Sequence, residues 1–123
     1  TMAQTALKAA ELLKKSGISA GVVNARFVKP LDEALLCKIA EHARYIVTLE
    51  ENSLMGGFGS AVLEALNSLG IDGPKILRLG LPDRFIEQGS REELLECLGL
   101  DPAGIAGKVQ QFVGVDSCAI TSA

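Results

Sequence analysis

The sequence predicts an α/β domain with three layers, in which helices cover both faces of an open, mostly parallel sheet. Segments with apolar residues at helical spacing alternate with short, β-rich apolar runs. This alternation is typical of parallel strands joined by right-handed helical crossovers. The apolar runs do not alternate cleanly between polar and apolar residues, which favours strands covered on both faces.

Length and composition agree with one ordinary globular domain. The chain has 123 residues, 48% of them hydrophobic and 22% charged, and a net charge of −3. Its cations are scattered, whereas nucleic-acid and anionic-membrane surfaces need clustered positive charge. No apolar run approaches the ~20 residues of a membrane helix. We therefore expect no nucleic-acid partner and no membrane partner, and a cytoplasmic location.

The first half of the chain predicts two helices and two strands. A helix begins near Met2 and stops at Gly17, because glycine is the usual residue after a helix end. A short buried strand follows at 20–25. Asp32 is a suitable N-cap for the second helix, and 45–49 is the next strand. Residues 50–57 are expected to form a polar loop.

The second half predicts three helices and one strand. A helix carries an apolar face from Phe58 to Leu69 and closes at Gly70, and a strand follows at 75–79. A long connection over 80–89 leads to a helix opened by a Ser90–Glu93 capping box. Asp101 and Pro102 open the last helix. We expect the domain to occupy 1–113 and the tail, 114–123, to be loose.

The loop after the strand 45–49 is the first candidate site. Open α/β sheets place ligands where strands end, and glycines there let backbone N–H groups approach an anion at a helix N-terminus. Residues 56–60 (GGFGS) could bind an anion or a nucleotide in this way. However, the glycine pattern is incomplete for a dinucleotide motif, and no GxxxxGK[ST] loop is present. A structural role in tight turning is the preferred interpretation.

Glu50 and Glu51 lie in this loop beside Asn52. Adjacent side chains diverge from an extended backbone, so the two carboxylates make a poor acid–base pair. We expect one of them to cap the following helix or to meet an arginine of a partner.

Other reactive residue types have structural explanations. His42 is the only histidine and falls on a predicted helix surface. Without a second histidine or a cluster of Cys and His residues, the sequence predicts no zinc site. Cys37 and Cys97 fall in apolar helical patterns and are expected to be buried, reduced thiols. We predict no catalytic residue, no metal ligand and no cofactor-binding residue in this chain.

Two further loops carry unusual mixtures of charged, aromatic and proline residues at strand ends. Loops at such positions commonly perform recognition, and apolar side chains on them are candidates for burial against another domain or subunit. The candidate interface residues of these two loops and of the glycine-rich loop are Arg26, Phe27, Lys29, Glu50, Glu51, Asn52, Gly56, Gly57, Asp83, Arg84, Phe85 and Ile86.

These segments together resemble the C-terminal domain of the transketolase family. The matching stretches are RFVKPLD at 26–32, VTLEENSLMGGFGSAV at 47–62 and GLPDRFIEQGSREELLECLGLDPAGI at 80–105. They occur in the family's order with similar spacing. The last stretch is most similar to the deoxyxylulose-phosphate synthase branch of the family.

The resemblance implies a longer parent enzyme that condenses pyruvate with glyceraldehyde 3-phosphate, on the route to isoprenoids, thiamine and pyridoxal. The parent would use thiamine diphosphate and Mg²⁺, and in this family both are held by the preceding domains. Asp72-Gly73 is not the family's GDG…N metal motif. The third domain would complete a homodimer, with the preceding domains and a second subunit as partners, in the bacterial cytoplasm or a plastid.

The resemblance also implies a strand before the first helix, so we expect this sheet to lack its first strand. Two alternatives remain open. One is the corresponding domain of a pyruvate dehydrogenase beta subunit or of a transketolase that docks a partner, and the other is an anion- or nucleotide-binding regulatory module.

Overall fold

The computed structural model describes residues 2–23, 32–53, 57–81 and 91–122. At 51–53, 81, 91 and 115–122 it describes the backbone alone. The chain divides into two compact units, one made of Thr1–Val23 with Arg84–Ala123 and the other of Asn24–Asp83. The units are described separately.

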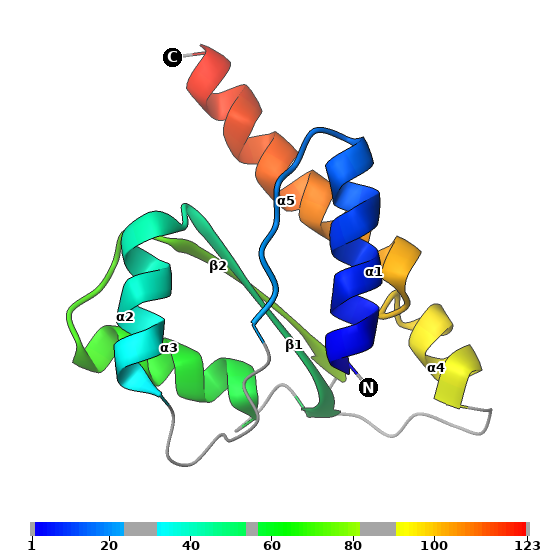
Figure 1. Cartoon of the computed structure of the whole chain (residues 1–123), viewed down its shortest axis with the longest axis horizontal. Helices are drawn as coiled ribbons and strands as arrows, with labels where there is room; N and C mark the ends of the chain where they lie inside the picture. The colour runs from blue at the N-terminus through cyan, green and yellow to red at the C-terminus, as the bar shows by residue number, and fades with distance from the viewer. Residues whose placement is uncertain (1, 24–31, 54–56, 82–90, 123) are drawn as a thin grey trace. The chain divides into compact units, whose positions relative to one another are not determined.

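The unit of residues 24–83 contains helix α2 (Glu33–His42), strand β1 (Tyr45–Ser53), helix α3 (Phe58–Ser68) and strand β2 (Lys75–Leu81). The strands run parallel and side by side (Figure 1), with Tyr45 paired to Lys75 and Leu49 to Leu79. Parallel strands need a crossover, and α3 provides it. The α/β class and the parallel pairing are therefore confirmed.

The core of this unit joins its helices to β2. Leu36 of α2 packs with Val62 and Leu66 of α3, and partly buried side chains, including Ile76 of β2, surround them. The predicted N-cap of α2 is also confirmed, because Asp32 Oδ1 accepts a hydrogen bond from Leu35 N at 3.0 Å.

The other unit contains helices α1 (Met2–Lys15), α4 (Arg91–Cys97) and α5 (Pro102–Ser122). The two terminal helices α1 and α5 pack together (Figure 1). The buried side chains of this unit are Ala9, Leu13, Leu95, Leu100, Ile105, Ala106 and Val109. As predicted, Asp101 caps α5, with its Oδ1 3.2 Å from Gly104 N.

Three helices end in the same way. Gly17, Gly70 and Gly99 follow α1, α3 and α4 with φ values of +84°, +72° and +71°. In each case the next residue donates its N–H to a carbonyl five residues earlier, as in Ile71 N to Leu66 O at 2.9 Å. This is the Schellman closure, in which glycine enters the left-handed region without a Cβ penalty.

Three expectations about elements were wrong. Ala20–Val23, in the described part of the expected first strand, is not in a strand, and Ala20, Gly21 and Val23 are exposed. A strand is defined by pairing, and no backbone pairing is recorded for these residues within the described chain. Asn24 and Ala25 lie outside the described residues.

The other two wrong expectations concern element ends. β1 continues through Ser53, where a loop was expected from Glu50, because a shift in register after Leu49 lets Ser53 pair with Leu81. The expected loose tail from Gly114 continues as α5 to Ser122. No proline interrupts this segment, and extending an existing helix orders one residue for each hydrogen bond gained.

Candidate functional site

The candidate site lies where β1 approaches the start of α3. Glu50 is buried, with 5% of its surface exposed. Its two carboxylate oxygens accept hydrogen bonds from Phe58 N at 2.8 Å and from Gly59 N at 2.7 Å. The N-cap of α3 is Gly57, which has no side chain to cap the helix. Glu50 therefore caps the helix from the strand.

This arrangement places a negative charge against the positive end of the helix dipole. Charge-assisted hydrogen bonds of this kind are stronger than neutral ones, and carboxylates stabilise helix N-termini. The N–H groups of Phe58 and Gly59 are those that an anionic ligand would use at this helix end. Because Glu50 already occupies them, the start of α3 is a filled anion site.

Gly59 allows the strand and the helix to approach closely. A Cβ atom at this position would lie 2.8 Å from Thr48 Oγ1, 3.0 Å from Arg78 Cδ and 3.1 Å from Glu50 Oε2. Real Cβ atoms do not tolerate the shortest of these distances. Glycine is therefore required at this position by packing, and Thr48, Glu50 and Arg78 converge on it.

Thr48 and Arg78 face each other across the two strands, because they are partners in the register of β1 and β2. Arg78 Nη1 donates to Ser60 Oγ at 3.1 Å, which connects β2 to the first turn of α3. Thr48 is 3% exposed, and its Oγ1 has no hydrogen-bond partner within the described residues. Most polar groups of this site form hydrogen bonds with one another, and these bonds connect the strands to the start of α3.

The structure places only some of the predicted interface residues. Glu50 caps α3 and Gly57 is the N-cap, whereas Glu51 and Asn52 belong to β1 with their side chains outside the description. The remaining predictions lie outside the described residues, and they concern Arg26, Phe27, Lys29, Gly56, Asp83, Arg84, Phe85 and Ile86.

Sequence reasoning placed Gly59 in the glycine-rich stretch 56–60 but did not include Thr48 or Arg78 in the site. One signal was available for Thr48, because residues two apart on a strand share a face and Thr48 stands two before Glu50. Arg78 could be found only from the register that pairs it with Thr48.

Other candidates for chemistry do not form a second site in the described residues. His42 ends α2 and is exposed, as expected for a surface histidine. Cys37 is half-buried, but the expected burial of Cys97 is wrong, because the buried leucine of α4 is Leu95 and Cys97 is exposed. Within the described chain no three His, Cys, Asp or Glu residues form a metal cluster. None of its helices is long and apolar enough to span a membrane.

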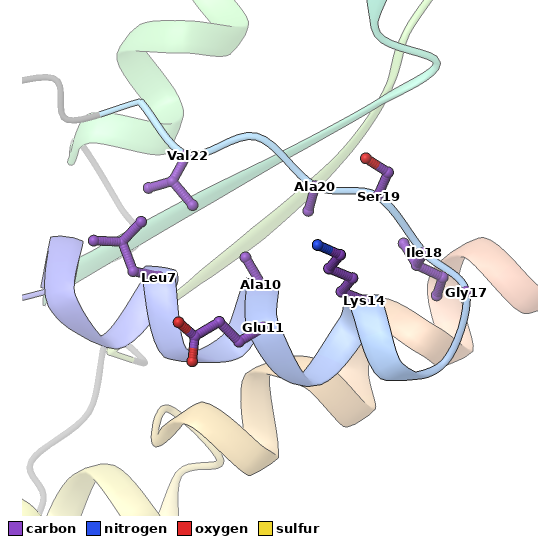
Figure 2. A pocket seen from close by; sticks show the side chains of 9 residues that line it. All are labelled: Leu7, Ala10, Glu11, Lys14, Gly17, Ile18, Ser19, Ala20 and Val22. Atoms are coloured by element: carbon purple, nitrogen blue, oxygen red, sulfur yellow. The ribbon is translucent and has the colours of Figure 1, made fainter.

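A shallow groove of about 500 Å³ lies between α1 and the segment that follows it. Figure 2 shows Leu7 and Ala10 on α1 and Ala20 and Val22 on the facing segment. Its charged side chains are those of Glu11 and Lys14, both exposed. The rest of the lining consists of the Ser19 hydroxyl, Gly17 and apolar side chains.

Comparison with known proteins gives a consistent result. The family model described as "Transketolase, C-terminal domain" matches residues 1–105. The 1-deoxy-D-xylulose-5-phosphate synthase 1 of Geobacter sulfurreducens is 52% identical over 108 residues, which make up 88% of this chain and 17% of that protein. The synthase of Cupriavidus taiwanensis is 51% identical over 123 residues, 100% of this chain and 18% of that protein.

A solved structure shares the fold. It is described as "Split gene transketolase, inactive beta4 tetramer" and matches with a TM-score of 0.77 and 39% identity. The match covers 89% of this chain and 34% of that chain. The chain thus spans less than one fifth of the length of the synthases that it matches.

Proposed function

Because this chain belongs to the transketolase C-terminal domain family, we propose that it is the non-catalytic assembly domain of a 1-deoxy-D-xylulose 5-phosphate synthase. The observation that carries the proposal is the identity of about half of its residues with synthases, over most of this chain. The full enzyme would condense pyruvate with glyceraldehyde 3-phosphate using thiamine diphosphate and Mg²⁺. The cofactor and the metal ion would be bound outside this segment.

The geometry at α3 supports a structural role for this segment. Glu50 uses its carboxylate to cap the helix, and Arg78 bonds Ser60. An acid–base catalyst needs an acid or base within reach of a substrate proton, and these side chains are committed to internal bonds. The filled helix end likewise disfavours the alternative of an anion- or nucleotide-binding module.

A transketolase domain is the second candidate. The solved relative supports it, because its description names a transketolase, but its identity to this chain is 39%, against 52% for the synthase. That relative is described as an inactive assembly of four beta chains. By analogy, a chain of this type would associate and not catalyse by itself.

The test combines an activity assay with calorimetry. The purified chain, supplied with pyruvate, glyceraldehyde 3-phosphate, thiamine diphosphate and Mg²⁺, is expected to give no product. Titration with thiamine diphosphate and Mg²⁺ is expected to give no binding heat. Measurable turnover would refute the non-catalytic role, and binding heat would refute the placement of the cofactor in other domains.

Assembly is tested in a full-length synthase that carries this segment. Replacing Phe85 and Ile86 with Ser should weaken the dimer, measured as molar mass by light scattering, because apolar loop residues commonly anchor interfaces. Leu63→Ser is the matched control, since Leu63 is a helix residue that is 37% exposed in this chain. Equal dimer stability in the loop variant and the control would show that these loop residues do not hold the subunits together.

A further inference from the structure

Asp72 and Gly73 lie between the end of α3 and the start of β2, and the proposed function gives them no role. Ile71–Gly73 has no regular secondary structure, and Asp72 and Gly73 are both exposed. An Asp-Gly pair is chemically distinctive, because glycine leaves the following backbone nitrogen without steric protection. The environment of the pair decides whether this reactivity is suppressed.

Among the residues that the structure describes, neither reacting group has a hydrogen-bonding partner. Within the described chain, neither the Asp72 carboxylate nor the Gly73 N–H takes part in a hydrogen bond or ion pair. A Cβ added at Gly73 would meet nothing within 4 Å, so there is open space around its backbone. Within the described chain, therefore, no hydrogen bond holds the Asp72 side chain or the Gly73 nitrogen in place, and the space beside the Gly73 Cα is open.

We propose that Asp72–Gly73 is a site of spontaneous backbone modification, at which Asp72 converts to isoaspartate. The Gly73 nitrogen attacks Cγ of the protonated Asp72 carboxyl group and loses its proton. One carboxyl oxygen leaves as water, which closes a five-membered succinimide. Water then adds to either carbonyl of the ring and reopens it. Opening at the original main-chain carbonyl leaves the chain running through the side-chain methylene, with no net change in mass.

Two other aspartates in the described chain provide internal comparisons. The Asp32 carboxylate accepts a hydrogen bond from Leu35 N, and the next residue, Glu33, begins α2. Ring closure there would require the cap to be released and the first helical turn to open. Asp101 precedes Pro102, whose nitrogen carries no proton to lose. Both are expected to stay unmodified where Asp72 converts.

The modification would act on the sheet. Lys75 N donates to Arg44 O at 3.0 Å, and Lys75 pairs with Tyr45 at the start of β2. An isoaspartate at 72 adds one main-chain atom shortly before this first pair. We therefore expect aged chains to exchange the Lys75 amide proton faster than fresh chains.

The experiment is ageing of the intact chain at neutral pH in oxygen-18 water, followed by trypsin digestion and mass spectrometry with electron-transfer fragmentation. The peptide 45–75 contains Asp72, and the peptide 27–38 contains Asp32. One oxygen-18 atom and the isoaspartyl backbone fragments are expected at Asp72 and not at Asp32. Deamidation of Asn52 or Asn67 changes the peptide mass and is thereby separated. Asp72→Glu, which would need a six-membered ring, should abolish the product while leaving the fold intact.

A synthetic peptide covering residues 68–78 separates the effect of the fold from that of the sequence. The folded chain and the peptide are expected to convert at similar rates, because the described part of the fold gives this pair no hydrogen bond. A folded-chain rate more than about tenfold slower, equal to about 1.4 kcal/mol in activation free energy, would overturn the proposal. Persistence of the product in Asp72→Glu would overturn the assignment to this residue.

Discussion

The hydrogen bonds of Glu50 determine whether the candidate site binds a ligand or has a structural role. A carboxylate at the end of a parallel strand, before a glycine-rich helix start, could hold a substrate, bind a metal or cap the helix. The distances of 2.8 and 2.7 Å to Phe58 N and Gly59 N identify capping. The carboxylate is buried, so its contribution to stability is not reduced by solvent as that of a surface charge would be.

Replacing Glu50 should therefore be costly. Glu50→Ala removes the acceptor of two backbone N–H groups, and we expect a loss of about 2–3 kcal/mol in the free energy of unfolding. Glu50→Gln keeps one carbonyl oxygen as an acceptor, so its loss in the free energy of unfolding should be smaller than that of Glu50→Ala. Urea denaturation measures both. Asp32→Ala, which removes an exposed cap, should cost only about 1 kcal/mol.

The same substitution can distinguish capping from a general packing defect. If Glu50→Ala vacates a carboxylate site, formate should raise the melting temperature of the variant more than that of the wild type, by mass action on the folded state. Equal effects of formate on Glu50→Ala, Asp32→Ala and wild type would contradict the view that the start of α3 is an anion site filled by Glu50.

Replacement of Gly59 by any larger residue is predicted to destabilise the chain, and the reason is steric. Alanine is favoured over glycine in a helix by about 1 kcal/mol, but its Cβ would press on Thr48, Glu50 and Arg78. We expect Gly59→Ala to destabilise the chain by about 1–3 kcal/mol. Gly107→Ala in α5, where an added Cβ meets nothing within 4 Å, should be neutral or stabilising. Urea midpoints that shift equally for the two variants would show that the contact at Gly59 is not restrictive.

The sequence could predict the residues of this site whose roles are local. The position of the two glutamates before a helix predicted either capping by one of them or contact with an arginine of a partner, and Asp32 and Asp101 were predicted as caps from their positions before helices. The role of Arg78 depends on the register of β1 against β2, which depends in turn on the crossover between them. A single sequence does not contain that register directly, so Thr48 and Arg78 were missed.

Among elements, the three helix ends closed by glycine were the most predictable, whereas the end of α5 and the strands were predicted less well. A glycine after a helix, followed by an apolar residue, signals the Schellman closure from local sequence. A strand depends on a partner, and this is why the apolar run at 20–25 misled the prediction whereas the paired run at 45–49 did not. The unexpected continuation of β1 to Ser53 likewise depends on Leu81 as its partner.

The closure of α3 provides a prediction at this scale. Gly70 has φ +72° and open space around it. A side chain at this position would therefore be disfavoured only by the strain of the left-handed backbone conformation. Gly70→Ala should cost about 1–2 kcal/mol, since an L-residue pays that amount in the left-handed region. Gly70→Asn should cost less, because asparagine tolerates this conformation better. Thermal melting compares the two variants, and equal losses would indicate that the backbone at this position relaxes instead.

At the scale of the whole molecule, the two chain ends belong to one compact unit. Gln110 Nε2 of α5 donates to Ser16 Oγ just beyond α1, so residues 94 positions apart are joined. Apolar periodicity identified both helices but could not identify them as partners, because periodicity reports the face of a helix and not its neighbour.

A chimera tests whether this chain can serve as the third domain of a synthase. Residues 1–105 would replace the matching region of the bacterial synthase that is 52% identical to this chain. Buried contacts between domains tolerate volume-conserving changes, so we expect kcat to stay within about tenfold of the parent, a change of about 1.4 kcal/mol or less in the activation free energy. The control chimera carries the matching region of the split-gene transketolase, which is 39% identical to this chain, and should lose more activity. A chimera that folds and dimerises but loses as much activity as the transketolase control would contradict the assignment of this chain to the synthase branch.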